Sequence, residues 1–223
     1  MMLASRAGLP TPGVKLLTLK TAVYLIERYD RETNEKGECT RVHQEDFCQA
    51  LGFLPDQKYE SEGGPGVRAC FSLISNSSSQ PLKDKLFLIQ WVIFNYLIGN
   101  SDAHAKNISI LFSETGVKLS PFYDLMSTAV YNELTKKMAM KIGGERRPGF
   151  VHKRHWERFA EETESKPKVI VDLCEELGKG IPELAKDLQT EFTAKDGADR
   201  IVQKICNVIE VRSKRLLLIL KGN

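Results

Sequence analysis

Three short polar side chains follow one another in the middle of the chain, in an order that could hold a metal ion beside a proton acceptor. Asp102 and Asn107 are five residues apart, and Asp124 lies seventeen residues after Asn107. A carboxylate such as that of Asp102 can orient a hydroxyl group and accept its proton. The amide oxygen of Asn107 and the carboxylate of Asp124 are ligands that Mg²⁺ prefers. These residue types therefore suit a magnesium-assisted transfer to a hydroxyl group.

The same order and spacing are typical of a kinase catalytic loop and its metal-binding aspartate. Either aspartate alone could equally be a helix cap or an Asx turn. The ordered set of three is more specific than its members. It predicts Asp102 as the catalytic base and Asn107 and Asp124 as the metal ligands of a phosphoryl transfer from ATP.

Two predicted elements would position these side chains. Residues 108–112 and 117–120 have the pattern of strands joined by a turn, so a hairpin would bring the two metal ligands together. Residues 82–98 are apolar around most of a helix, which predicts a buried central helix. This helix would deliver the catalytic aspartate from a rigid base, as a catalytic group requires.

The motifs around these three residues resemble those of a known family. Residues 97–107, LIGNSDAHAKN, together with residues 121–124, PFYD, resemble the HipA family of bacterial serine/threonine kinases, the toxins of toxin–antitoxin pairs. The resemblance covers nearly the whole chain in the same order. Its further segments are residues 26–31, 43–49, 58–60, 63–66, 141–144 and 155–157.

The resemblance implies an α+β fold, mostly α-helical, like the C-terminal lobe of a protein kinase. Residues 1–31 would be the remnant of the N-terminal lobe, with a helix end, two strands and the hinge. Residues 32–223 would be the helical C-terminal lobe with the catalytic loop and the metal-binding hairpin. The residue patterns favour the same division, because residues 14–18 and 22–26 have the pattern of two short strands.

By the same resemblance, Glu27 and Tyr29 would lie beside the base of ATP at the hinge, although an ordinary strand end with a surface ion pair fits the same residues. His104 could hydrogen-bond a phosphate or orient the loop of the second aspartate, or it could be a structural histidine. Lys106 could neutralise phosphate charge, or it could be a solvated lysine. Together with the two metal ligands, these residues are expected to bind ATP and Mg²⁺.

The segment that precedes the predicted hinge departs from the family pattern. Family members carry a glycine-rich loop and a phosphate-binding strand lysine before the hinge, and the residues before Glu27 contain neither in the needed order. We therefore expect the chain to be the C-terminal portion of a HipA-like kinase. It would need the missing N-terminal kinase segment to complete the nucleotide clamp, and its activity without that segment is left open by the sequence.

The resemblance also implies the partners. They are ATP, an antitoxin protein and a protein substrate whose serine or threonine receives the γ-phosphate; in characterised members this substrate is an aminoacyl-tRNA synthetase. Two other functions fit the residues: a catalytically inactive remnant that binds a partner through its helical surface, and a small-molecule kinase with a different acceptor pocket. Magnesium-dependent binding of ATP would distinguish a kinase from an inactive remnant, because an inactive remnant is expected to show no such binding.

Composition narrows the class of protein. The 32 basic and 29 acidic residues give a formal net charge of +3, which does not indicate a nucleic-acid surface. Five scattered cysteines without a C-x-x-C pair favour a reducing compartment over disulfides or a zinc site. The most apolar stretch, residues 86–98, is too short and too interrupted by amides to cross a bilayer. We therefore expect a cytoplasmic protein without a membrane or direct nucleic-acid partner.

The remaining elements are predicted from periodicity and capping signals. The pattern predicts a strand at residues 136–144. It predicts helices at residues 1–8, 44–51, 67–75, 155–164, 167–177, 181–192 and 196–220.

Overall fold

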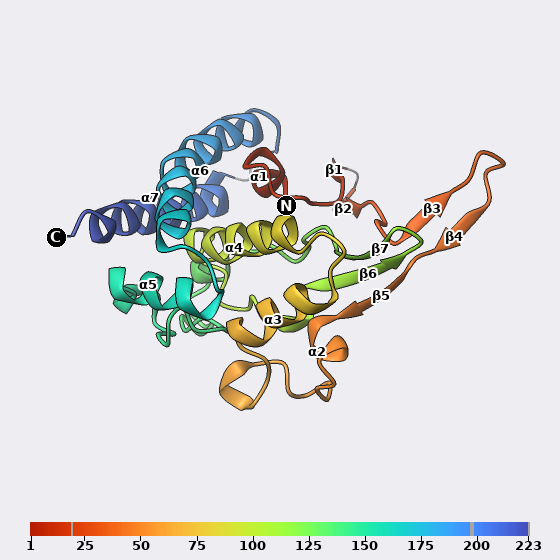
Figure 1. The fold of residues 1–223 in the computed structure, drawn as a ribbon. Helices are drawn as coiled ribbons and strands as arrows, with labels where there is room; N and C mark the ends of the chain where they lie inside the picture. Colours follow the sequence, from red (N-terminus) through yellow and green to blue (C-terminus); the bar gives the residue numbers. More distant parts are fainter. Residues whose placement is uncertain (19, 197–198, 223) are drawn as a thin grey trace.

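The centre of the fold is α4 (Pro81–Ile98), in a computed structural model that describes residues 1–18, 20–196 and 199–222. Every residue from Trp91 to Ile98 is buried, which confirms the predicted central helix. One neighbour, α3 (Val67–Ser77), extends two residues beyond its predicted end. Figure 1 shows α4 in the middle of the molecule, with the long C-terminal helices on one side and α3 on the other.

Three helices form the C-terminal part of the chain: α5 (Lys153–Glu162), α6 (Pro167–Asp196) and α7 (Asp199–Leu220). α6 and α7 pack against each other and against α4 (Figure 1). The predicted start of the last helix, residue 196, falls on the final residue of α6, and residues 197–198 lie outside the described part. In α7 the buried side chains include Ile209, Leu216 and Leu220.

The predicted break between residues 177 and 181 is wrong. α6 is one helix that continues through Pro182, which removes one backbone hydrogen bond from the helix interior. Leu177 and Ile181 on one side of the proline, and Ala185 on the other, are all buried in the core. Because helices in proteins are stabilised mainly by packing of their apolar face, this packing outweighs the local cost of the proline.

The N-terminal part consists of a short helix and a separate hairpin. α1 (Met2–Arg6) is followed by β1 (Val14–Thr18) and β2 (Ala22–Ile26), which pair antiparallel with Val14 opposite Ile26. Both predicted strands are confirmed. The hairpin forms a sheet of only two strands, and it exposes the large apolar side chains of Leu16, Tyr24, Leu25 and Ile26.

A second sheet has the strand order β5–β6–β7. β6 (Ser109–Ser113) and β7 (Gly116–Leu119) are the predicted hairpin. β5 (His43–Asp46) begins where a helix was predicted, and only the one-turn α2 (Phe47–Ala50) after it is helical. These residues form a strand and not a helix because β5 pairs along β6. This contact joins distant segments, so local periodicity does not predict it.

A third pair of strands, β3 (Arg31–Thr33) and β4 (Cys39–Arg41), forms an antiparallel hairpin in the polar stretch after the predicted hinge. It projects from one end of the molecule (Figure 1). Its side chains are mostly exposed and polar, so the sequence carried little apolar alternation to predict it.

The predicted strand at residues 136–144 is wrong. The segment is irregular, and Ile142 makes only an isolated bridge with Glu145. Met138, Ala139 and Met140 are all buried in succession, whereas a strand at a sheet surface would alternate. The segment closes on itself, because the Met138 N–H donates to the Arg146 carbonyl at 2.8 Å.

A buried carboxylate joins the central helix to the β6–β7 hairpin. Asp84, in the first turn of α4, accepts hydrogen bonds from the Leu119 N–H at 2.9 Å, from Ser78 Oγ at 2.6 Å and from Gln80 Nε2 at 3.0 Å. These bonds hold β7 against the start of α4. The helix and the hairpin that flank the predicted site therefore form one unit.

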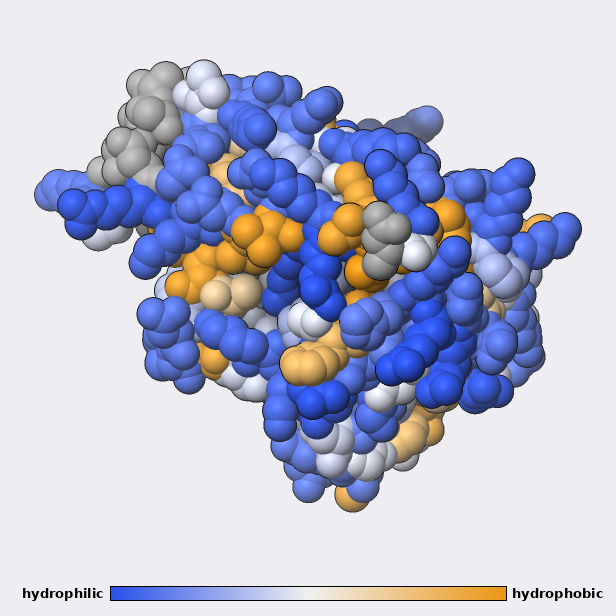
Figure 2. Space-filling model, turned by 90° about the vertical axis from the view of Figure 1, so that its left-hand side faces the viewer, coloured by the Kyte–Doolittle hydropathy of each residue, from blue (hydrophilic) through white to orange (hydrophobic). Residues whose placement is uncertain are grey.

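The face at the left of Figure 1 is mainly hydrophilic, with local apolar exceptions (Figure 2). On the face at the left of Figure 1, hydrophobic residues form an interrupted band within hydrophilic surroundings (Figure 2). Among the described residues, no helix combines the length and the apolar character needed to cross a membrane.

Candidate active site

The loop that carries Asp102 begins at a left-handed turn. α4 ends at Gly99, whose φ of 78° suits glycine, and a β-carbon there would lie 2.7 Å from the Ala129 β-carbon. The Ser101 N–H donates to Thr128 Oγ1 at 2.7 Å, and the Thr128 hydroxyl donates to the Gly99 carbonyl at 3.1 Å. The start of the catalytic loop is therefore fixed through its backbone.

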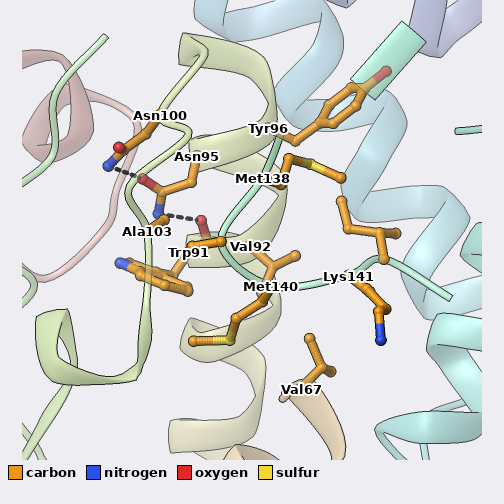
Figure 3. A pocket seen from close by; sticks show the side chains of 12 residues that line it. Val67, Trp91, Val92, Asn95, Tyr96, Asn100, Ala103, Met138, Met140 and Lys141 are labelled. Carbon is orange, nitrogen blue, oxygen red and sulfur yellow. Dashed lines mark hydrogen bonds between the residues drawn. The ribbon is translucent and has the colours of Figure 1, made fainter. Parts of the chain in front are cut away.

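Asn100 joins the two aspartate segments. Its Oδ1 accepts a hydrogen bond from the Asp102 N–H at 3.0 Å, and its Nδ2 donates to the Asp124 carbonyl at 3.3 Å. The same Nδ2 donates to Asn95 Oδ1 at 2.9 Å, and Asn95 in turn donates to the Trp91 carbonyl at 2.8 Å (Figure 3). A buried chain of amides thus connects α4 with the backbone of both aspartates.

Asn107 lies beside Asp102 and keeps one polar atom available. It is buried in the 3₁₀ turn η2 (Ala105–Asn107), and its Nδ2 donates to the Asp102 carbonyl at 3.0 Å. This bond points the amide nitrogen at the catalytic loop and leaves Oδ1 without a donor among the described residues. An amide oxygen in this state is a suitable magnesium ligand.

The hairpin and an aromatic ring place Asp124. The Ser120 N–H donates to the Ser109 carbonyl at 2.8 Å, which closes the hairpin. The Tyr123 hydroxyl donates to the Lys106 carbonyl at 2.9 Å and lies 2.7 Å from Ser109 Oγ. Asp124 has a φ of 55°, a left-handed conformation that is uncommon outside glycine and clusters at functional sites. No described residue bonds its carboxylate.

Tyr59 and His104 surround one oxygen of Asp102. The Tyr59 hydroxyl donates to Asp102 Oδ1 at 2.7 Å, and His104 Nε2 lies 3.9 Å from the same oxygen. The His104 ring meets the Tyr59 ring edge-on at 5.2 Å between centroids. Burial lowers the pKa of His104, with the Asp102 charge opposing that effect, and only 5% of the residue is exposed. A neutral imidazole is therefore favoured in the folded protein.

This burial makes stability depend on pH. An unfolded histidine titrates near pH 6.5 and the folded His104 titrates lower, so stability is complete above that pH and falls as the pH drops towards the folded pKa. We expect His104→Gln to lose less stability than wild type between pH 7.5 and pH 5.5 in urea unfolding. His43→Gln, at an exposed histidine, is the control. Equal losses in wild type and His104→Gln would contradict the prediction.

Three further residues are predicted to contact the nucleotide: Tyr29, Glu27 and Lys106. Tyr29 stacks on Tyr123, with ring centroids 6.0 Å apart and an interplanar angle of 18°, so it adjoins the residue before Asp124. Glu27 is exposed just after β2. Lys106 Nζ donates to the Pro55 carbonyl at 3.4 Å. The roles assigned to these side chains stay predictions.

Two of the cavities formed by the described residues adjoin the loop that carries Asp102. One, of ≈ 310 Å³, lies beside Asp102; its lining includes Tyr59, Ser101, Thr128, Lys137 and Arg146, but neither Asn107 nor Asp124. The other, of ≈ 30 Å³, lies behind the loop between α4 and the irregular segment at residues 138–142 (Figure 3). The ≈ 30 Å³ cavity is too small for a nucleotide or an acceptor side chain. The ≈ 310 Å³ cavity beside Asp102 is therefore the candidate space for the acceptor.

The donor set fits a magnesium ion that is bound together with phosphates. Among the described residues, no three His, Cys, Asp or Glu side chains gather into a metal cage. Magnesium in kinases takes only one or two protein oxygens, because phosphates and waters complete its shell. The Oδ1 of Asn107 and the carboxylate of Asp124, which have no described hydrogen-bond donor, would be such a pair.

Three residues of the site were not predicted from the sequence: Asn100, Thr128 and Tyr59. An amide at position 95 inside the fully buried stretch of α4 and a second one just after that helix were available signals, because buried polar groups need partners. Tyr59 is 43 residues from Asp102 in the sequence, and no local pattern connects them.

Comparison with known proteins identifies the family of the chain. Residues 1–185 match the family model described as HipA-like C-terminal domain. A candidate kinase of Sinorhizobium fredii, Y4mE, is 45% identical over 164 residues, which are 73% of this chain and 39% of that protein. The serine/threonine-protein kinase toxin HipA of Shewanella oneidensis is 30% identical over 197 residues, 82% of this chain and 45% of that protein. The chain thus spans less than half the length of these relatives.

Solved structures confirm the fold. HipA of Shewanella oneidensis, in a complex with HipB and operator DNA, superposes with a TM-score of 0.90 and 26% identity over 99% of this chain and 55% of that one. The kinase CtkA of Helicobacter pylori superposes with a TM-score of 0.59 and 12% identity over 99% of this chain and 81% of that one. The second match shows a kinase-like fold alone. With the family model matching most of its length, the chain belongs to the family of HipA-like C-terminal domains.

Proposed function

We propose that the chain is the catalytic region of an ATP-dependent serine/threonine protein kinase. Asp102 is the base that orients the acceptor hydroxyl, and Asn107 and Asp124 are the magnesium ligands. The observation that carries this proposal is the pair of bonds from Asn100 to the backbone of both aspartates, at 3.0 and 3.3 Å. These bonds link the two segments that carry the proposed site residues, which supports the proposal.

The residues of the chain would act mainly by positioning. Asp102 accepts the proton of the acceptor hydroxyl. Its backbone is fixed by hydrogen bonds with the side chains of Asn100 and Asn107. Bound Mg²⁺ would supply charge neutralisation on the phosphates of ATP. Asn107 Oδ1 and the Asp124 carboxylate would hold that ion, and their own partners leave these oxygens free for it.

The nucleotide would lie between the hairpin and the segment after β2. The stacked rings of Tyr29 and Tyr123 offer an aromatic surface for the base, and the backbone around Glu27 offers hinge contacts. His104 would orient the loop or meet a phosphate. Lys106 would reach a phosphate by exchanging its bond with the Pro55 carbonyl.

The missing N-terminal kinase segment is part of this proposal. Residues 1–31 would be the remnant of the N-terminal lobe and residues 32–223 the C-terminal lobe. The β1–β2 hairpin exposes Leu16, Tyr24, Leu25 and Ile26, and an isolated two-stranded hairpin is marginally stable in water. A further β-sheet lobe with the glycine-rich loop and the strand lysine would cover these side chains.

Further partners are proposed from the relatives. HipA of Shewanella oneidensis was solved with HipB and operator DNA as a toxin–antitoxin system, so we propose an antitoxin protein as a partner of this chain. The acceptor would be a serine or threonine of a cytoplasmic protein, and an aminoacyl-tRNA synthetase is the candidate that the family resemblance suggests.

The test is calorimetric titration with a non-hydrolysable ATP analogue, with and without Mg²⁺. We expect wild type to bind the analogue more tightly with Mg²⁺, and Asp124→Asn to lose about tenfold or more of the magnesium-dependent affinity, because a carboxylate ligand is removed. Asp172→Asn, at an exposed aspartate on α6, is the matched control and should bind like wild type.

Each outcome has a distinct meaning. Magnesium-dependent binding that Asp124→Asn does not change would contradict the metal role of Asp124. An absence of any binding by wild type would favour a remnant that binds a partner, and the same titration on a chain extended upstream would then distinguish a missing clamp from an inactive fold.

A further inference from the structure

Tyr59 reaches the catalytic aspartate from a distant loop. It stands at the start of the 3₁₀ turn η1 (Glu60–Glu62), and its hydroxyl donates to Asp102 Oδ1 at 2.7 Å. This is the kind of bond that an acceptor hydroxyl must make with the base during phosphoryl transfer. A fixed side chain of the protein therefore already occupies one oxygen of the base.

The loop holds Tyr59 in this place. The Tyr59 carbonyl accepts hydrogen bonds from the N–H groups of Glu62 and Gly64, both at 2.9 Å. The turn is so tight that a β-carbon on Gly64 would lie 2.4 Å from the Gln57 carbonyl oxygen. The ring could not leave Asp102 by a backbone movement without breaking these contacts.

A second contact anchors the same loop to the core. The Glu60 carboxylate accepts from the Lys141 N–H at 2.7 Å and pairs with Lys141 Nζ at 3.1 Å. Lys141 follows directly on the buried segment at residues 138–140. Tyr59 is thus tied on one side to this segment and on the other, by its ring, to His104.

The two oxygens of Asp102 have different surroundings. Oδ1 receives the Tyr59 hydroxyl and faces His104 Nε2, whereas no described residue donates to Oδ2. Tyr59 and Asp102 both line the ≈ 310 Å³ cavity. The predicted metal ligands, Asn107 and Asp124, are not among its lining residues. Asp102, whose Oδ2 has no described donor, therefore borders the candidate acceptor space.

We propose that Tyr59 is a positioning residue for Asp102: its hydroxyl fixes Oδ1 and so leaves Oδ2 to receive the acceptor hydroxyl. This inference rests on the proposed kinase function and adds a residue to it. Tyr59 acts through Asp102, and among the described residues no hydrogen bond or ring contact joins it to Asn107 or Asp124.

The ionisation of the phenol agrees with this role. Burial, followed by the hydrogen bond to Asp102, raises the pKa of Tyr59 to about 12. The phenol therefore stays protonated at neutral pH and remains a donor to Asp102. It cannot compete with Asp102 as a base.

The kinetic test uses Tyr59→Phe, which keeps the ring against His104 and removes only the hydroxyl. ATP hydrolysis, with water in place of the unidentified acceptor, is followed under saturating Mg²⁺. We expect kcat to fall about tenfold, with KM for ATP and the thermal midpoint unchanged, because orientation of the base is lost while the nucleotide contacts remain. Tyr131→Phe, at an exposed tyrosine to which no role is assigned, should match wild type.

The opposite results would overturn the proposal. An unchanged kcat would show that the hydroxyl does not position the base. A raised kcat would show that Tyr59 blocks the acceptor instead. If neither the wild-type chain nor the chain extended upstream binds magnesium-ATP or turns it over, the kinase function itself is overturned, and the role of Tyr59 with it.

A measurement without turnover checks the contact itself. The six tyrosines are replaced by 3-fluorotyrosine, and the ¹⁹F signal of residue 59 is assigned by its absence in Tyr59→Phe. We expect this phenol to titrate above the exposed tyrosines, and its titration to move to lower pH in Asp102→Asn, because the negative charge that favours the protonated phenol is removed. An unmoved titration would overturn the Tyr59–Asp102 contact.

Discussion

Asp102→Asn is expected to lower phosphoryl transfer by about 10³-fold, because general-base catalysis typically contributes 10²- to 10⁴-fold. The amide has the shape of the carboxylate but cannot accept the proton of the acceptor hydroxyl. The backbone bonds of residue 102 with Asn100 and Asn107 do not involve the changed atoms, so the fold and the magnesium site should persist. The rate of γ-phosphate release from ATP and the calorimetric affinity for its analogue measure the two properties separately.

Asp56→Asn is the matched control for this substitution, at an exposed aspartate of the loop before Tyr59. It should leave both rate and affinity unchanged. A rate in Asp102→Asn within about threefold of wild type would remove Asp102 from the role of base. Parallel losses of affinity and rate would place Asp102 at the nucleotide instead of the acceptor.

Elements that depend on short-range pattern were predictable from the sequence. The apolar run of α4 and the alternation of β6 and β7 around a turn gave both the central helix and the hairpin. Since these two elements flank the motif, the spacing of Asp102, Asn107 and Asp124 predicts that their side chains lie together. The bonds from Asn100 to both aspartate segments agree with that expectation.

Elements that depend on distant partners were not predictable. Residues 43–46 form a strand only because β6 is there to pair with them, although the same stretch carries a helix cap at Asp46. The irregular segment at residues 138–140 buries three successive side chains against α4, which no strand or helix period describes. The bond between Tyr59 and Asp102 has the same origin, since it joins two loops far apart in the sequence.

The roles of the buried amides could not be predicted from the sequence for a different reason. Asn95 and Asn100 interrupt an apolar stretch, and the sequence alone does not tell whether such amides face solvent or one another. In the folded chain they bond to each other and to the backbone of the catalytic loop. Because a buried amide without partners is costly, this small network couples the stability of the core to the geometry of the site.

Asn100→Ala is therefore expected to lower the free energy of unfolding by about 3 kcal/mol, since the buried Asn95 Oδ1 and the Asp102 N–H both lose their partner. Urea unfolding measures this loss. Magnesium-dependent nucleotide binding should weaken as well, because the carbonyl of Asp124 is released. Asn76→Ala removes an exposed amide on α3 and should cost less than about 0.5 kcal/mol. A loss of stability in Asn100→Ala with unchanged nucleotide binding would mean that the network supports the core and does not place Asp124.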